Sequence, residues 1–333
     1  MKVRLGTTSL VMLFVLGIGI PTSCDHNIGT DNYSWCDETL RPELGAHEEL
    51  TTSRSWFKVF GVGNGVFAIL EPYNFQEIVS YLIIGNQRAL LFDTGMGMDS
   101  MSLLIKELTD LPVTVINSHT HYDHIGSNHE FDHILGVDTA YTHNWSNNGW
   151  GHEAVRHEVA PDAFCSTHLP HLDTAKYQIF PYEINEFVKD GQEIDLGERI
   201  IKVLFTPGHT PDAISLYDKE NGYLWTGDTF YEGTIWLFFE GTDLDAYHSS
   251  ITKMASLSTG LKSIFPGHNL PISDPQLLPD FVERFEMIIN GDKSPNVGED
   301  FGHPEDDRAA IFDFGMYSFL IRKDALKDKG IIN

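Results

Sequence analysis

Four side chains that can bind a metal ion lie within six residues, and this cluster constrains the fold more than any other feature. They are His119, His121, Asp123 and His124. Residues 113–116 form an apolar run just before them and predict a buried strand. The cluster is therefore expected at the carboxyl end of a strand, where open α/β sheets place their functional groups. The alternative is a polar turn that carries three histidines by chance, and the regular spacing favours a metal site.

The chain is strongly acidic, with 22 Lys and Arg against 48 Asp and Glu among 333 residues and a formal net charge of −26. This charge argues against a nucleic-acid partner, because phosphate backbones are bound by basic surfaces. It also opposes electrostatic attraction to anionic lipid. A small-molecule substrate remains, and the charge is interpreted as favouring solubility. The length fits one large domain or two small ones.

The first 24 residues predict a signal peptide. Lys2 and Arg4 give a basic start, and residues 10–20 form an apolar core of signal-peptide length. Residues 21–24 resemble the bacterial lipoprotein box, with proline where leucine is usual. This resemblance implies lipid on Cys24 and a periplasmic or cell-envelope location, with membrane attachment through that lipid. Residues 25–52 are polar and predict a tether, so the folded domain is expected over 53–333.

The chain has three cysteines, Cys24, Cys36 and Cys165. No two of them have Cys-x-x-Cys spacing, so a cysteine zinc cluster is not expected. If Cys24 carries lipid, Cys36 and Cys165 remain as a possible disulfide pair in an oxidising compartment. The sequence alone leaves that pairing open.

Short apolar runs separated by turn residues predict two similar halves. The first half is expected to form an antiparallel meander, then a helix, and the second half a further sheet and two helices. Expected strands are 56–60, 66–70, 79–84 and 89–92, with a helix at about 99–109. In the second half they are 194–196, 200–205, 213–217 and 223–226, with helices at 243–257 and 275–290 and a closing strand within 312–321.

Residues 140–175 show neither a helical nor a strand period and predict a long irregular loop. Trp145 and Trp150 either line a pocket or pin this loop to the core. The loop also contains five histidines without ligand spacing, which are expected to be surface or hydrogen-bonding residues. They are His143, His152, His157, His168 and His171.

Three later loops place a histidine or aspartate directly after a glycine, which lets the backbone turn tightly. These loops contain Gly208-His209, Gly227-Asp228 and Gly267-His268. Together with Asp93-Thr94-Gly95 and the cluster at 119–124, they make five motifs in one order. In that order the chain resembles the metallo-β-lactamase superfamily over residues 56 to about 322. The implied fold is α/β, an αββα sandwich of two mixed sheets flanked by helices.

The resemblance also implies a binuclear metal site with seven ligands. His119, His121 and His209 would hold the first ion, Asp123, His124 and His268 the second, and Asp228 would bridge them. The cofactors expected are two divalent ions, zinc in the first place, with iron and manganese as alternatives. A hydroxide shared by the two ions would attack a carbonyl carbon, and Asp123 would be catalytic by orienting it and accepting its proton.

The implied function is hydrolysis of an activated acyl bond in a thioester, a lactone or another ester. Residues 207–218 and 226–231 resemble the branch that contains acyl-coenzyme A thioesterases, and glyoxalase II-like and lactonase branches are also similar. A β-lactamase-type amide hydrolase is the competing enzyme class, and Asp228 counts against it because β-lactamases generally lack a bridging aspartate. A non-catalytic metal-binding lipoprotein is the alternative outside enzymes, and the complete ligand set counts against it.

Overall fold

The computed structural model describes residues 41–165, 170, 172–296 and 308–332, which form three sheets and their covering helices. The strands of the first sheet are β1 (Glu48–Leu50), β2 (Lys58–Gly63), β3 (Val66–Leu70), β4 (Val79–Ile84), β5 (Ala89–Phe92), β6 (Val113–Ile116), β7 (Ile134–Val137) and β8 (Glu186–Val188). The other strands are β9 (Glu193–Asp195), β10 (Ile200–Phe205), β11 (Ile214–Asp218), β12 (Tyr223–Gly227), β13 (Thr234–Leu237), β14 (Ser263–Pro266), β15 (Ala309–Asp313) and β16 (Ser318–Arg322).

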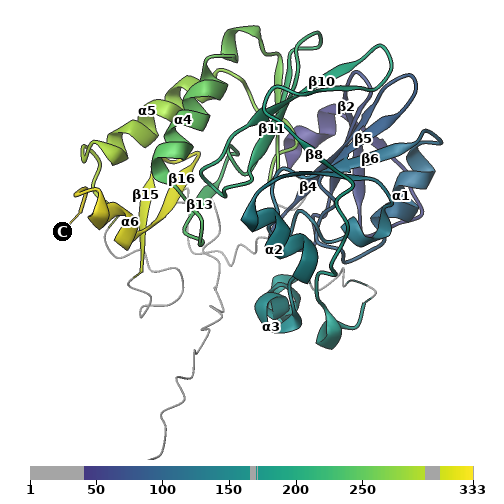
Figure 1. Ribbon diagram of the computed structural model, residues 1–333, viewed down its shortest axis with the longest axis horizontal. Coiled ribbons are helices and arrows are strands. Elements are labelled where there is room, and N and C mark those ends of the chain that lie inside the picture. The colour runs from purple at the N-terminus through teal and green to yellow at the C-terminus, as the bar shows by residue number, and fades with distance from the viewer. Residues whose placement is uncertain (1–40, 166–169, 171, 297–307, 333) are drawn as a thin grey trace, which may run out of the picture.

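The helices are short and lie mainly on the outer faces of the sheets (Figure 1). The α-helices are α1 (Met101–Leu108), α2 (Ala140–Asn148), α3 (His152–Val155), α4 (Leu244–Ala255), α5 (Leu277–Ile289) and α6 (Lys323–Asp328). The 3-10 helices are η2 (Pro42–Ala46), η3 (Asn128–Glu130), η4 (Arg156–Val159), η5 (Pro161–Ala163), η6 (Thr174–Lys176) and η7 (Ser258–Gly260). Among the described residues, no helix is both long enough and apolar enough to span a bilayer.

The first sheet has eight strands in chain order. Strands β1 to β5 pair antiparallel with their neighbours, and β5 to β8 pair parallel. The predicted meander is confirmed, and β3, β4 and β5 have the predicted bounds. Every residue of β5 is buried, because both faces of this sheet are covered.

The second sheet has five strands in the order β14-β12-β11-β10-β9, and the third has three in the order β13-β16-β15. In the second sheet β12 and β14 are parallel and the remaining pairs are antiparallel. The strands predicted at 213–217 and 223–226 are present as β11 and β12, which pair antiparallel.

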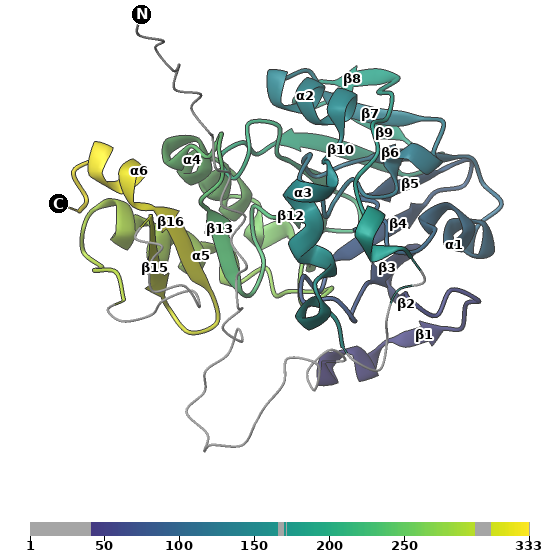
Figure 2. The ribbon, with the colours of Figure 1, turned by 90° about the horizontal axis from the view of Figure 1, so that it is seen from below.

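Three apolar clusters separate four layers, as expected for the αββα sandwich (Figure 2). Leu104 of α1 packs in one cluster with Leu91 of the first sheet. A second cluster lies between the two large sheets and includes Tyr81 and Trp225. In the third cluster Phe285 of α5 meets the outer face of the second sheet and the third sheet. Burial of these faces is the main force that holds the layers together.

The predicted helices at 99–109, 243–257 and 275–290 are present, and local capping explains where two of them begin. Ser100 accepts a hydrogen bond from the backbone N–H of Leu103 at the start of α1. Asp243 accepts from the backbone N–H groups of Asp245 and Ala246 at the start of α4. Such caps satisfy N–H groups that have no partner within the helix.

Two sequence-based expectations are wrong. The loop predicted at 140–175 contains α2, which begins at its cap Thr139 and ends before Gly149, whose φ is +64°. The closing strand predicted within 312–321 is two antiparallel strands, β15 and β16, because Gly315 turns the chain with a φ of +88°. Each turn depends on a glycine in the left-handed region.

Part of the predicted tether is folded. Residues 42–46 form a 3-10 helix, and β1 pairs antiparallel with β2 at the edge of the first sheet. Cys165 is disulfide-bonded, and the sequence left open whether Cys36 is its partner. Its predicted partner Cys36, the predicted signal peptide with Cys24, and His168 and His171 lie outside the described residues.

Candidate metal centre

The predicted ligands come together where the two large sheets meet, because each follows the end of a strand. Residues 119–124 follow β6 of the first sheet. His209, Asp228 and His268 follow β10, β12 and β14 of the second sheet. Backbone hydrogen bonds join the two sheets beside the site, and one of them runs from the N–H of Ile214 to the carbonyl oxygen of Ser118 at 2.7 Å. The site thus draws on both sheets.

Three buried histidines, called the first trio, form one half of the site. They are His119, His121 and His209. Nδ1 of His121 lies 2.9 Å from Nε2 of His119 and 3.1 Å from Nε2 of His209. Three ring nitrogens therefore point at one small volume, which is the arrangement that a shared cation requires.

The second trio combines a carboxylate with two histidines. It consists of Asp123, His124 and His268. Oδ2 of Asp123 lies 3.7 Å from Nε2 of His124 and 3.6 Å from Nε2 of His268. This set offers both negative charge and neutral nitrogen donors to a cation.

Asp228 lies between the two trios and presents one oxygen to each. Its Oδ1 is 3.2 Å from Nε2 of His124 and 3.2 Å from Nε2 of His268. Its Oδ2 is 3.9 Å from Nε2 of His119 and 3.6 Å from Nε2 of His209. Asp228 therefore faces both trios, one with each carboxylate oxygen.

The buried polar atoms of the site fit a divalent cation. Within each trio the donor atoms lie within 4.8 Å of one another. In the described part of the chain, Nε2 of His124 and Oδ1 of Asp228 are buried without a hydrogen-bond partner. A buried polar atom left in this way is costly, and a bound cation would satisfy both.

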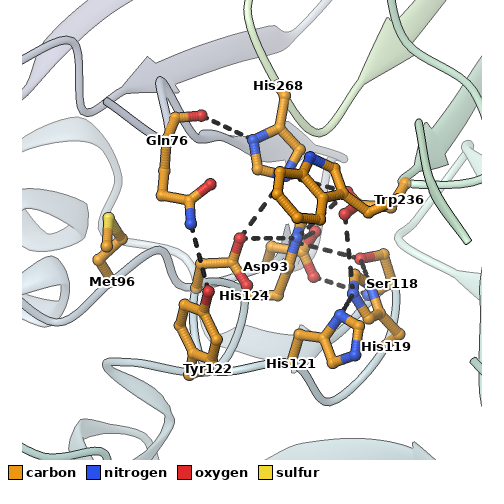
Figure 3. A network of polar contacts seen from close by, with 12 residues as sticks. Gln76, Asp93, Met96, Ser118, His119, His121, Tyr122, His124, Trp236 and His268 are labelled. Carbon is orange, nitrogen blue, oxygen red and sulfur yellow. Dashed lines mark hydrogen bonds and ion pairs between the residues drawn. The ribbon is translucent and has the colours of Figure 1, made fainter. Parts of the chain in front are cut away.

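Outward-facing partners orient four of the histidines (Figure 3). Oδ2 of Asp93 is 2.9 Å from Nδ1 of His124, and Oγ of Ser118 is 3.0 Å from Nδ1 of His119. His209 and His268 donate from Nδ1 to the carbonyl oxygens of Trp236 and Gln76, at 2.8 and 2.7 Å. Such partners fix the tautomer that leaves the inner nitrogen free to bind a metal.

Asp93 belongs to a sequence motif from which no role was predicted for it. The structure gives it two contacts, since its Oδ1 also accepts from the backbone N–H of Ser118 at 2.6 Å. Its position in Asp93-Thr94-Gly95 was the available signal. The carbonyl groups of Gln76 and Trp236 carry no side-chain signal, so no pattern could have found them.

A family model of the metallo-beta-lactamase superfamily matches residues 74–268, which include all seven predicted ligands. The chain belongs to the metallo-beta-lactamase superfamily. The predicted family is therefore confirmed, and so is its fold, a mixed α/β architecture.

Two proteins of known name are similar to this chain in sequence. It is 24% identical to acyl-coenzyme A thioesterase MBLAC2 of Homo sapiens over 234 residues, which cover 64% of this chain and 81% of the relative. It is 29% identical to hydroxyacylglutathione hydrolase of Rippkaea orientalis over 150 residues, covering 44% of this chain and 46% of the relative. The superfamily comprises metal-dependent hydrolases, and these relatives carry hydrolase names.

Solved structures agree on the fold alone. The metallo-beta-lactamase from Pontibacter korlensis has a TM-score of 0.50 at 16% identity, covering 69% of this chain and 99% of that one. The sec-alkylsulfatase Pisa1 from Pseudomonas sp. has a TM-score of 0.54 at 14% identity, covering 70% and 42%. Proteins whose names denote different reactions thus share the architecture, so the reaction must be argued from the site.

The protonation of the two trios differs. Burial lowers the pKa of His119 and His121 well below the usual range and that of His209 to about 4, so the first trio is neutral near pH 7. Burial also opposes a charged His124, but Asp228 and Asp123 outweigh it and raise the pKa of His124. The carboxylates thus act chiefly on the second trio.

The two carboxyl groups also differ from each other. Burial raises the pKa of Asp123 to about 6, against the opposing effect of His124 and His268. For Asp228 burial acts in the same direction, but His268, His124 and His119 outweigh it and hold its pKa well below the usual range. Asp228 is therefore the permanent anion of the site.

Three aromatic rings lie beside His121. The ring centroids of Tyr141, Trp150 and Phe239 lie 6.2, 6.3 and 4.9 Å from that of His121. Trp145 stacks on Trp150 at 3.4 Å. The sequence left open whether Trp145 and Trp150 line a pocket or pin a loop to the core. In the structure Trp150 lies next to the site, and Trp145 packs against Trp150.

The other histidines of residues 140–175 that the structure describes have hydrogen-bonding or ion-pair roles, as expected. His143 lies against Asp138 at 2.8 Å, and Nδ1 of His152 against the carbonyl oxygen of Tyr177 at 2.9 Å. His157 pairs with Glu158 at 2.9 Å. None of these three belongs to either trio.

Proposed function

We propose that the protein is a hydrolase that uses two divalent ions, zinc in the first place, to cleave an activated acyl bond. The observation that carries the proposal is the pair of buried trios joined by Asp228, whose two oxygens face different trios. His119, His121 and His209 would hold one ion and Asp123, His124 and His268 the other. When bound, such ions supply Lewis acidity that polarises a carbonyl group and lowers the pKa of a water molecule.

The role of the chain in the reaction follows from the position of Asp123. Its carboxylate lies at the second trio, close enough to hold and orient a water molecule there. The water oxygen forms a bond to the acyl carbon, and Asp123 accepts the proton that the water loses. The bond from the acyl carbon to sulfur or oxygen then breaks, and the leaving thiolate or alkoxide takes up the proton that Asp123 accepted, which returns Asp123 to its carboxylate form. No serine or cysteine nucleophile is needed.

A thioester, a lactone or another ester is the proposed substrate class. The thioesterase and hydroxyacylglutathione hydrolase names of the relatives support it. Aromatic rings beside His121 offer an apolar surface to the substrate. These observations support hydrolysis of a thioester or ester over hydrolysis of the amide bond of a β-lactam.

The test is a substrate panel run on protein of measured metal content. Protein purified without chelator is expected to contain about two equivalents of transition metal. It should hydrolyse at least one thioester, lactone or ester faster than a phosphoester and a chromogenic cephalosporin. Activity on the cephalosporin alone would support the β-lactamase alternative. Two bound ions without turnover of any acyl substrate would support a metal-binding protein, and one ion at full occupancy would refute the binuclear site.

We also propose that the protein is exported and anchored through lipid on Cys24. The basic start, the apolar core and the lipoprotein-like box motivate this, and the disulfide bond of Cys165 is chemistry that oxidising compartments permit. Mass spectrometry of protein made in a bacterial host should find a mature chain that begins at a lipid-modified Cys24. An intact Met1, or cleavage elsewhere with a soluble product, would contradict the anchor.

A further inference from the structure

A buried carboxylate outside the proposed ligand set lies next to the first trio. Asp212 is only 2% exposed. Its Oδ2 accepts hydrogen bonds from the hydroxyl groups of Thr120 and Thr142, at 2.7 and 3.1 Å. Its Oδ1 accepts from the hydroxyl group of Thr210 at 2.7 Å. All three donors are neutral, so these bonds orient the carboxylate without cancelling its charge.

The three threonines connect Asp212 to the chain segments that supply the first trio. Thr120 lies between His119 and His121, and Thr210 directly follows His209. Thr142 belongs to α2, which gives the carboxylate a third anchor. A single side chain therefore links the loop of the first sheet to the loop of the second.

The charge of Asp212 needs an explanation beyond cross-linking. Burying a carboxylate costs several kcal/mol unless its charge is compensated. Asparagine could bond to the same hydroxyls at a lower desolvation cost, by accepting through its amide oxygen on one side and donating from its Nδ2 to a hydroxyl oxygen on the other. Asp212 and His119 line the same small cavity of about 10 Å³, so the carboxylate lies next to the first trio, whose only ligand carboxylate is Asp228, shared with the second trio.

The second trio has a comparable arrangement. There Asp93 lies behind a histidine, 2.9 Å from Nδ1 of His124, and also bonds the backbone of Ser118. Each half of the site thus has one buried aspartate outside the ligand set. Asp93 contacts its histidine directly, whereas Asp212 acts through the threonines beside the ligands.

We propose that Asp212 is a positioning residue for the first trio. It holds the loops of His119, His121 and His209 at the separation at which three nitrogens share one cation, and its negative charge favours a divalent ion there. The proposal rests on the proposed function in one respect, that the first trio is a metal site.

The direct test is Asp212→Asn, which keeps the size and one acceptor oxygen of the side chain but removes the charge. Loss of an outer-shell carboxylate typically lowers metal affinity about 10- to 100-fold. We expect a loss of that size for one ion, with the affinity for the other changed less than about threefold. Competition with a chromophoric chelator measures both affinities, and the absorption spectrum of the cobalt(II)-substituted protein reports the geometry of the affected site.

Thermal unfolding of the metal-free protein separates positioning from general stabilisation. Without metal, Asp212→Asn should be at least as stable as the wild type, because it removes a buried charge. A merely structural role predicts the opposite pattern, with lower metal-free stability and two unchanged affinities. That pattern would overturn the proposal.

Two threonine variants keep the test decisive if Asp212→Asn does not fold. Thr120→Val removes one hydroxyl donor and should weaken the same ion about fivefold, the effect of losing about 1 kcal/mol of hydrogen bonding. Thr206→Val is the matched control, because the buried Thr206 hydroxyl contacts the hydroxyl groups of Ser215 and Thr229 and makes no hydrogen bond to Asp212. If Thr120→Val and Thr206→Val bound the ion at the first trio with equal affinity, the inference would be refuted. A wild-type protein that binds no metal would instead refute the proposed function.

Discussion

The two halves of the candidate metal centre use different chemistry. The first trio is three neutral imidazoles, whose pKa values burial lowers. In the second trio Asp123 adds a carboxylate, and nearby carboxylates raise the pKa of His124 and His268 although burial opposes this. One half would therefore hold its cation chiefly with nitrogen lone pairs and the other chiefly with negative charge. Asp228 belongs to both halves.

The largest effect is expected from Asp228→Asn, because this change weakens both halves at once. One oxygen faces His124 and His268 and the other faces His119 and His209. Hydrolysis of the best substrate should fall more than about 10²-fold, beyond the usual range for an outer-shell partner. Affinity for both ions should fall, as measured by elemental analysis after dialysis. Loss of a single ion would show that Asp228 belongs to one half only.

A smaller and one-sided effect is expected from Asp123→Asn. The change removes the proposed proton acceptor, so turnover should fall roughly 10²-fold, the scale for losing a general base. It should weaken the ion at the second trio and spare the ion at the first. Rates and metal content are measured on the same sample. The exposed Asp138→Asn serves as control and should behave as wild type.

If Asp123→Asn retained both ions and the wild-type rate, the proton-acceptor role would be wrong. If instead its rate followed metal occupancy alone, Asp123 would be a ligand without a separate catalytic role. Either result would sharpen the contrast between the halves.

The smallest effect on the site is expected from Glu71, which affects the stability of the fold. Glu71 is bonded to the turn that follows Asp93. Its carboxylate accepts from Nε1 of Trp56 at 2.7 Å and from the backbone N–H of Met96 at 2.9 Å. Burial raises its pKa from 4.5 to about 7. Because the pKa of Glu71 is higher in the folded state (about 7) than in the unfolded state (4.5), its contribution to the free energy of unfolding is fully present below pH 4.5. This contribution is lost as the pH rises through 7.

We therefore expect the wild type to lose roughly 2 to 3 kcal/mol of unfolding free energy relative to Glu71→Gln between pH 5 and pH 8. Urea unfolding followed by tryptophan fluorescence at several pH values measures the difference. Glu107→Gln is the control, because this exposed carboxyl has a lowered pKa and should not affect that window. A constant gap between wild type and Glu71→Gln would contradict the raised pKa.

Local patterns in the sequence were sufficient for most strands. The apolar runs agree with the bounds of five strands, which are β3, β4, β5, β6 and β10. A buried strand has a short continuous apolar sequence, so its ends can be located from the sequence. Helix α2 was missed because residues 140–148 are mostly polar and poor in strong helix formers. Its Thr139 cap and Gly149 end were the signals that could have revealed it.

The sequence by itself determined the family and the ligand candidates, because metal-binding side chains of the right type recur at the ends of strands in one order. The tertiary structure alone decided how those side chains are supported. The contact of Asp212 with Thr120 spans 92 positions, and that of the Gln76 carbonyl with His268 spans 192. Such contacts follow from how two sheets pack, and no local pattern encodes which buried groups will then face each other.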